Sequence, residues 1–135
     1  MTALPPRFDI SEDEIARVVA TFYAHVRAHP GLGPVFAAHV GDWPAHEAKV
    51  TEFWKASILH SGRYDGNVVQ VHKEAGNVRP GMFDAWLGLF DMVLRHELTP
   101  DKAAAWSALA HRIGRTLRAG VVDRMQGPGG VPILR

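Results

Sequence analysis

Apolar side chains recur every three or four residues along most of the chain, the spacing of one face of an α-helix. A Ser-x-x-Glu capping box at residues 11–14 precedes the first such stripe, which covers residues 15–26. This stripe predicts a helix that ends near Pro30, because proline disfavours helical backbone at the residue before it. The apolar segment 32–40 is long enough for one or two further turns.

The middle of the chain predicts one long helix and one short one, separated by a loop. Asp42 has a side chain suited to the N-cap of a helix from near Pro44 to about Ser61. Residues 61–67 have the composition of a loop. The apolar spacing over residues 68–75 then predicts a short helix, which Gly76-Asn77 can end in left-handed backbone.

Two more stripes occupy the last third of the chain. One covers residues 83–94 of a helix expected to open at Arg79-Pro80, and the other covers residues 106–117 of a helix expected to open at Thr99-Pro100. Residues 126–135 contain three glycines and two prolines and are expected to form a mobile tail. Since no segment alternates with a period of two, the predicted fold class is all-α.

Composition and charge narrow the class of protein further. A chain of 135 residues with 47% hydrophobic residues fits a single globular domain over residues 1–135, without a linker or a repeat. The absence of cysteine excludes disulfides and thiolate metal sites. A net charge of +1 gives no argument for nucleic acid, and no apolar run is long enough for a membrane span or a signal peptide. We therefore expect a cytoplasmic protein. The sequence leaves open whether it is a monomer or a weak dimer.

Two histidines, His46 and His72, lie on the apolar faces of separate predicted helices. A lone buried histidine most often bonds a backbone carbonyl, but two such faces can also enclose a planar cofactor, and imidazole is a common ligand of haem iron. A non-haem metal is the alternative, although no carboxylate shares these faces. Tyr23 and Trp86 each carry a polar hydrogen on an apolar face, suited to a partly negative ligand. These residues alone leave the choice open.

A wider set of residues between about 10 and 120 matches the pattern of one protein family. The matching residues are Phe22-Tyr23, Leu32-Gly33-Pro34-Val35-Phe36, Trp43, His46, Lys49, Phe53-Trp54, Tyr64-Asp65-Gly66, His72, Phe83 and Trp86. In these residues the chain resembles the truncated haemoglobins of group III. The resemblance implies a truncated globin, a two-over-two helical sandwich around haem b (iron protoporphyrin IX). Segment 73–78 departs from the pattern, since it carries charge and glycine where apolar residues are expected.

The resemblance also implies roles for individual side chains. His72 corresponds to the proximal ligand of the iron, and Tyr23 and Trp86 to distal donors toward a bound ligand. His46 corresponds to the distal histidine, which either ligates the iron itself or gates access to it. The other residues implied to contact haem are Phe36 at its edge, Phe53, and Lys49 and Arg79 near the propionates.

A globin of this kind is expected to bind dioxygen, nitric oxide and other small diatomic ligands. Two hydrogen-bond donors would slow the release of dioxygen, which favours redox chemistry such as nitric oxide dioxygenation or peroxide handling, with an unidentified reductase as electron donor. One alternative is a reversible oxygen carrier or ligand sensor without turnover. The other is a haem-free helical scaffold whose histidines are ordinary core residues.

Overall fold

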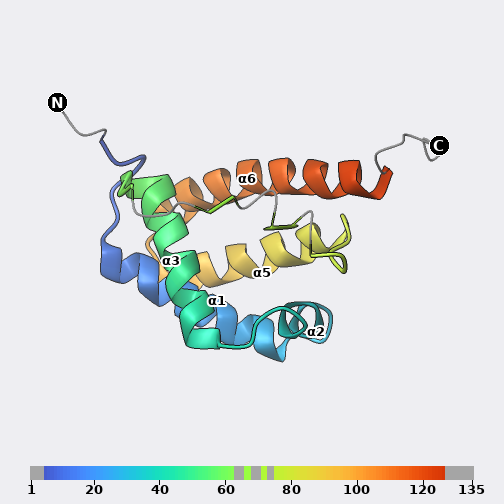
Figure 1. Cartoon of the computed structure of the whole chain (residues 1–135). Helices are drawn as coiled ribbons and strands as arrows, with labels where there is room; N and C mark the ends of the chain where they lie inside the picture. The colour runs from blue at the N-terminus through green and yellow to red at the C-terminus, as the bar shows by residue number, and fades with distance from the viewer. Residues whose placement is uncertain (1–4, 63–65, 68–70, 73–74, 127–135) are drawn as a thin grey trace.

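The computed structural model of the chain describes residues 5–62, 66–67, 71–72 and 75–126. Its regular elements are the helices α1 (Glu12–Ala28), α2 (Leu32–Ala37), α3 (Trp43–Leu59), α5 (Met82–Glu97) and α6 (Pro100–Gln126) (Figure 1). These ranges contain no strand, so the all-α prediction is confirmed. Within them, no helix combines the length and the hydropathy needed to cross a bilayer.

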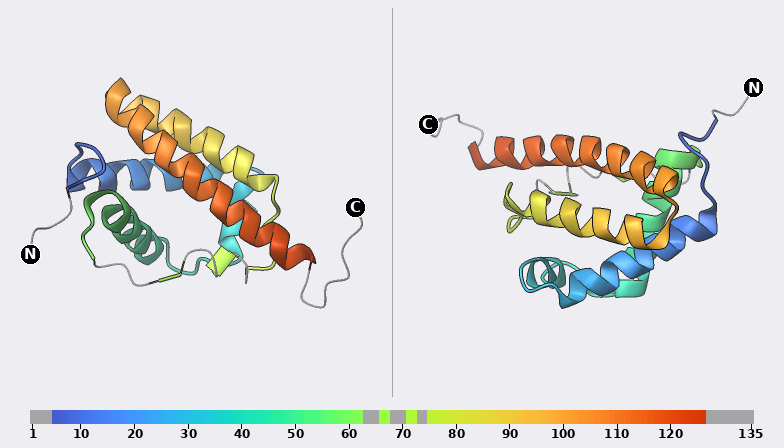
Figure 2. Two further views of the ribbon diagram at one scale, coloured as in Figure 1. Left: turned by 90° about the horizontal axis from the view of Figure 1, so that it is seen from above. Right: turned by 180° about the vertical axis from the view of Figure 1, so that it is seen from behind.

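The long helices form two pairs that pack on one another. α1 packs against α3, α5 packs against α6, and α1 also contacts α5 (Figure 1). Seen from above, α5 and α6 run side by side and cross α1 (Figure 2). The short helix α2 lies against α1 and touches α5. This arrangement of two helices over two is the one expected from the sequence.

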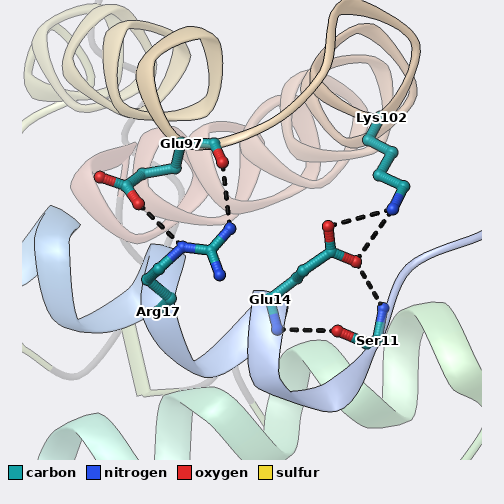
Figure 3. Close-up of polar contacts among 5 residues, drawn as sticks. All are labelled: Ser11, Glu14, Arg17, Glu97 and Lys102. Atoms are coloured by element: carbon teal, nitrogen blue, oxygen red, sulfur yellow. Dashed lines mark hydrogen bonds and ion pairs between the residues drawn. The ribbon is translucent and has the colours of Figure 1, made fainter.

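The first turn of α1 is fastened by the predicted capping box. The Glu14 backbone N–H donates to Ser11 Oγ at 3.0 Å, and the Ser11 backbone N–H donates to Glu14 Oε1 at 2.9 Å (Figure 3). Lys102 Nζ lies 3.0 Å from the same carboxylate, and Arg17 Nε lies 2.9 Å from Glu97 Oε1. The hydrogen bond from the Ser11 backbone and the contact with Lys102 lower the pKa of Glu14. The start of α1 is thereby joined to the region where α5 meets α6.

The last turn of α1 leads directly into α2. The backbone N–H groups of Gly31 and Leu32 both donate to Nδ1 of His29 at 3.0 Å, which orders the turn between the two helices. Gly33 then approaches the end of α1 so closely that a Cβ atom there would lie 3.0 Å from the Arg27 carbonyl oxygen and 3.1 Å from that of Val26. Any larger residue at this position would push α2 away from α1.

Most predicted helix boundaries agree with the structure. Asp42 caps α3 by accepting a hydrogen bond from the Ala45 backbone N–H at 3.0 Å. The helix ends at Leu59, just short of the expected end, because His60 adopts left-handed backbone with φ 58°. α6 begins at Pro100 as predicted.

The predicted opening of α5 at Arg79-Pro80 is wrong by about two residues. Pro80 lies in a turn, where the Met82 backbone N–H donates to the Arg79 carbonyl at 3.0 Å, and regular α-helix begins only at Met82. Hydrogen bonds between residues three apart form such a tight turn ahead of the helix proper. Proline therefore precedes the helix here and does not take its first position.

The segment predicted as a loop and a short helix lies partly outside the described residues. Residues 63–65, 68–70 and 73–74 are not described. The predicted tail over residues 126–135 begins one residue too early, since Gln126 is the last residue of α6, and residues 127–135 are not described. The described residues Val71 and His72 are helical, as predicted. Gly76 has a φ of 85°, which confirms left-handed backbone at the predicted end of the short helix.

Phe90 of α5 lies at the centre of the core, with 1% of its surface exposed. Its ring stacks on Trp86 at 5.2 Å between centroids and on Trp54 at 5.6 Å, with interplanar angles of 9° and 14°. Phe22 and Trp106 meet it edge-on at 5.1 and 5.5 Å. Side chains of α1, α3, α5 and α6 thus converge on a single ring.

Replacing this ring should therefore cost much of the stability of the fold. We expect Phe90→Ala to lower the free energy of unfolding by about 3–5 kcal/mol, the range for a phenylalanine removed from a packed core. Urea unfolding followed by circular dichroism measures the change. Met92→Ala, on the exposed side of the same helix, is the control and should stay within about 0.5 kcal/mol of the native chain. A loss below about 1 kcal/mol for Phe90→Ala would contradict its central place.

Candidate functional site

A cavity of about 500 Å³ lies among the helices and is bordered by residues of α1, α2, α3, α5 and α6. This volume is within the range of about 300–1,000 Å³ that is usual for small-molecule sites. Its apolar lining residues are Leu32, Val35, Phe36, Val40, Val50, Phe53, Trp54, Val71, Ala75, Val78, Met82, Phe83, Ile113 and Leu117. Its other lining residues carry polar groups: Tyr23, His39, His46, Lys49, His72 and Trp86.

The cavity brings together nearly all of the site residues expected from the sequence. These are Tyr23, Phe36, His46, Lys49, Phe53, His72 and Trp86, which come from four helices and from the segment between α3 and α5. Arg79 is different, since it is exposed on the turn before α5 and is not one of the lining residues.

His46 lies near the start of α3, with its ring in an aromatic cluster. The ring centroid lies 5.0 Å from that of Tyr23, 6.1 Å from Trp43 and 6.3 Å from Phe36. Nε2 of His46 is buried and has no hydrogen-bond partner in the part of the chain that the structure describes. An unpartnered buried nitrogen costs about 1–3 kcal/mol, so this atom is better explained by a ligand in the cavity than by an ordinary core position.

Burial keeps the two polar rings of this cluster uncharged. It lowers the pKa of His46, an effect that the nearby Glu47 carboxylate opposes and the Lys49 ammonium reinforces. Burial also raises the pKa of Tyr23 well above its ordinary value, with Glu47 adding to the effect. At neutral pH the cavity wall therefore presents a neutral imidazole and a phenol that keeps its hydrogen.

His72 and Trp86 border the same cavity from other elements. The His72 ring, which is half-buried, lies 6.2 Å from the Phe83 ring at an interplanar angle of 42°. The Trp86 indole is held by its stack on Phe90 and by an edge contact with Phe22 at 5.4 Å. Neither ring belongs to a larger ligand set, because the described residues contain no group of three or more histidine, cysteine or acidic side chains that could hold a metal.

One polar lining residue, His39, was not predicted from the sequence. Its Nε2 lies 2.7 Å from Oδ1 of Asn77, and Nδ2 of Asn77 donates to the Val35 carbonyl at 3.3 Å. Asn77 thus ties α2 to the segment that follows His72. An exposed histidine in a short segment carries no periodic signal, so the sequence offered no means of finding it.

The comparisons with known proteins agree with this geometry. No family model matches the chain. Over 86 residues it is 33% identical to the group 3 truncated hemoglobin ctb of Campylobacter jejuni, a match that spans 61% of this chain and 68% of that protein. The chain belongs to the group III truncated haemoglobins.

A comparison of structures supports the same assignment. The present chain matches the crystal structure of the group III truncated hemoglobin from Campylobacter jejuni with a TM-score of 0.80 and 26% sequence identity. That match covers 84% of this chain and 92% of the other. The predicted truncated globin fold is therefore confirmed.

The lowered pKa of His46 predicts that acid destabilises this truncated haemoglobin. Above pH 6.5, the ordinary histidine value, the ring is neutral in both the folded and the unfolded chain and adds no pH dependence. Below it, the unfolded chain takes up the proton first, so the free energy of unfolding falls until the pH has passed the lowered pKa of the folded state.

Urea unfolding at about pH 7.5 and about pH 5.5 tests this effect over the range in which histidines titrate. The His46→Phe variant should lose less stability between these two values than the native chain does. His96→Phe, at an exposed position of α5, should behave like the native chain. An equal loss in the native chain and in His46→Phe would contradict the assignment.

Proposed function

We propose that the cavity binds haem b, with His72 as the proximal ligand of the iron. One observation carries the proposal: His72 shares an apolar cavity with His46, whose buried Nε2 has no partner among the described residues. The lining suits a planar porphyrin, since Phe36 and Phe53 offer it ring surfaces. The exposed Lys49 at the wall suits a propionate carboxylate. The name of the related haemoglobin supports the same cofactor.

When bound, the haem iron supplies the centre at which a diatomic ligand coordinates and exchanges electrons. The chain would orient the haem, exclude water from the apolar cavity and supply hydrogen-bond donors to the ligand. Tyr23 keeps its hydroxyl hydrogen because its pKa is raised, and Trp86 carries an indole N–H that cannot be lost at neutral pH. Each bond from such a donor to a charged acceptor contributes about 1.5–3 kcal/mol. Two donors in one apolar cavity would hold a partly negative ligand firmly.

We infer that this truncated haemoglobin binds dioxygen and nitric oxide and acts on them by redox chemistry. Slow ligand release is unsuited to oxygen delivery and favours nitric oxide dioxygenation or peroxide handling, with electrons from a separate reductase. His46 takes part from the distal side, where its neutral ring either meets the iron or moves aside for the ligand. Arg79 is a weaker candidate for a propionate, because it lies on an exposed turn away from the lining.

Haem binding is tested by absorption spectra of the purified chain in the ferric, ferrous and carbon monoxide states. We expect a Soret band in all three states. We also expect His72→Ala to lose haem or to hold it weakly, because the proximal imidazole is gone. His96→Ala, at an exposed position, is the control and should keep the native spectrum. A normal five-coordinate ferrous spectrum in His72→Ala would refute the proximal role of His72.

The distal donors are tested by the rate at which dioxygen dissociates from the ferrous protein. Tyr23→Phe and Trp86→Leu should each speed release by about 10- to 100-fold, since 1.36 kcal/mol corresponds to a factor of ten. Met92→Ala, on the exposed side of α5, should leave the rate unchanged. Unchanged rates in both cavity variants would refute the distal assignment. Turnover of nitric oxide or peroxide with a reductant would separate an enzyme from a carrier or sensor.

A further inference from the structure

The two ends of α3 are fastened to the rest of the chain in different ways. At its C-terminal end, Arg7 contributes two hydrogen bonds, from its backbone N–H to the Ile58 carbonyl at 2.8 Å and from Nε to the Ser57 carbonyl at 2.7 Å. Lys55 adds an ion pair to Glu12 at 3.1 Å. This end of the helix is therefore held by several polar contacts.

In the described ranges, the polar contacts from α1 to the N-terminal end of α3 come from one side chain, Arg27, while Tyr23 packs its ring against the same turns. Nη1 of Arg27 lies 2.8 Å from Oε2 of Glu47, and its guanidinium carbon lies 5.1 Å from the centroid of the Trp43 ring. In the described ranges, this is the one ion pair that joins residues 43–50 to another element. Arg27 thus combines an ion pair and a cation–π contact on the same two turns of α3.

Trp43, the residue under the Arg27 guanidinium, contacts two residues that line the cavity. Trp43 meets the His46 ring edge-on, at 6.1 Å and 84°, and lies 6.2 Å from the Tyr23 ring. Tyr23 and His46 both line the cavity, whereas Trp43 stands behind them and is partly exposed. A continuous set of contacts therefore runs from Arg27 at the surface, through Trp43, to the ring of His46.

We propose that Arg27 is a positioning residue that clamps the first two turns of α3 onto the end of α1 and so holds His46 at the cavity wall. When the clamp is loosened, these turns separate from α1 and the His46 ring leaves the wall. Exposed ion pairs and exposed cation–π contacts are individually weak, so such a clamp opens readily at ordinary temperature. Access of a small ligand to the cavity is then governed by a residue that does not line it. This last step rests on the proposed function.

The chain provides a matched control on the same helix. Arg17 also lies in α1 and pairs with a glutamate, Glu97, at 2.9 Å (Figure 3). The exposed fractions of the Arg17 and Arg27 side chains are 49% and 41%. Glu97 belongs to α5 and does not line the cavity, so Arg17→Leu removes a similar ion pair without touching the start of α3.

Amide hydrogen exchange tests the clamp whether or not haem is present. In Arg27→Leu, the backbone amides of residues 46–50 should exchange about three- to tenfold faster, the change expected when one exposed ion pair and one exposed cation–π contact are lost. The amides of residues 54–59 should keep their protection. Arg17→Leu should leave both sets unchanged. Arg27→Lys should restore part of the protection, because it keeps a cation beside Glu47 but loses the planar guanidinium over Trp43. Unchanged exchange at residues 46–50 in Arg27→Leu would overturn the proposal.

Carbon monoxide rebinding after flash photolysis tests the consequence for access in the haem-loaded protein. Arg27→Leu should rebind about three- to tenfold faster, in proportion to the larger open fraction, and Arg17→Leu should rebind at the native rate. Glu47→Gln should fall between them, because the cation–π contact remains. Faster exchange with unchanged rebinding would overturn the proposal. If the chain takes up no haem, the proposed function fails, and the exchange measurement still decides whether Arg27 positions this part of α3.

Discussion

Phe90 lies between the two indoles that border the cavity, Trp54 from α3 and Trp86 from α5. A small chain that keeps a space of about 500 Å³ in its interior gives up packing that would otherwise fill the core. The stack of Trp54, Phe90 and Trp86 compensates for this lost packing, because it borders the space with flat side chains that have few rotatable bonds. Phe22 and Trp106 brace the central ring from its edges. The shape of the cavity thus depends on the same contacts that hold the core together.

The apolar wall also determines the charge states inside the cavity. Tyr23 and His46 meet edge-on at 5.0 Å, and burial acts on the pKa of each in the direction that favours its neutral form. The phenol therefore offers a hydrogen and the imidazole keeps a lone pair at neutral pH. Glu47 sits beside this cluster, but its own carboxylate is paired with Arg27 on the outside. The negative charge that acts on Tyr23 and His46 is thus partly balanced by Arg27.

Most of the fold could be predicted because buried apolar residues recur at helical spacing along the sequence. The predictions that failed concern residues at the surface, where no such spacing applies. The stripes of α1, α3, α5 and α6 follow from the spacing of apolar residues, and the same spacing placed His46 and His72 on inward faces. Pro80 misled the prediction because a proline suits both the first turn of a helix and the tight turn before one. Arg79 was expected in the site from the family pattern, but a surface arginine gives no sign in the sequence of where it points.

The contacts of His39 and Arg27 were beyond the reach of sequence patterns for the same reason. His39 pairs with a residue 38 positions away, and Arg27 with one 20 positions away, so no local spacing connects them. Exposed polar residues are free to face any neighbour, and only the packing of the helices brings the partners together.

The last turn of α1 contacts two elements that border the cavity, α2 and the start of α3. Its backbone carries α2, since the carbonyl oxygens of Val26 and Arg27 lie against Gly33 without any side chain between them. The side chain of Arg27 carries the start of α3 on another side of the same turn. A small tilt of this turn would therefore shift both elements together, so the width of the cavity depends on the position of the end of one helix.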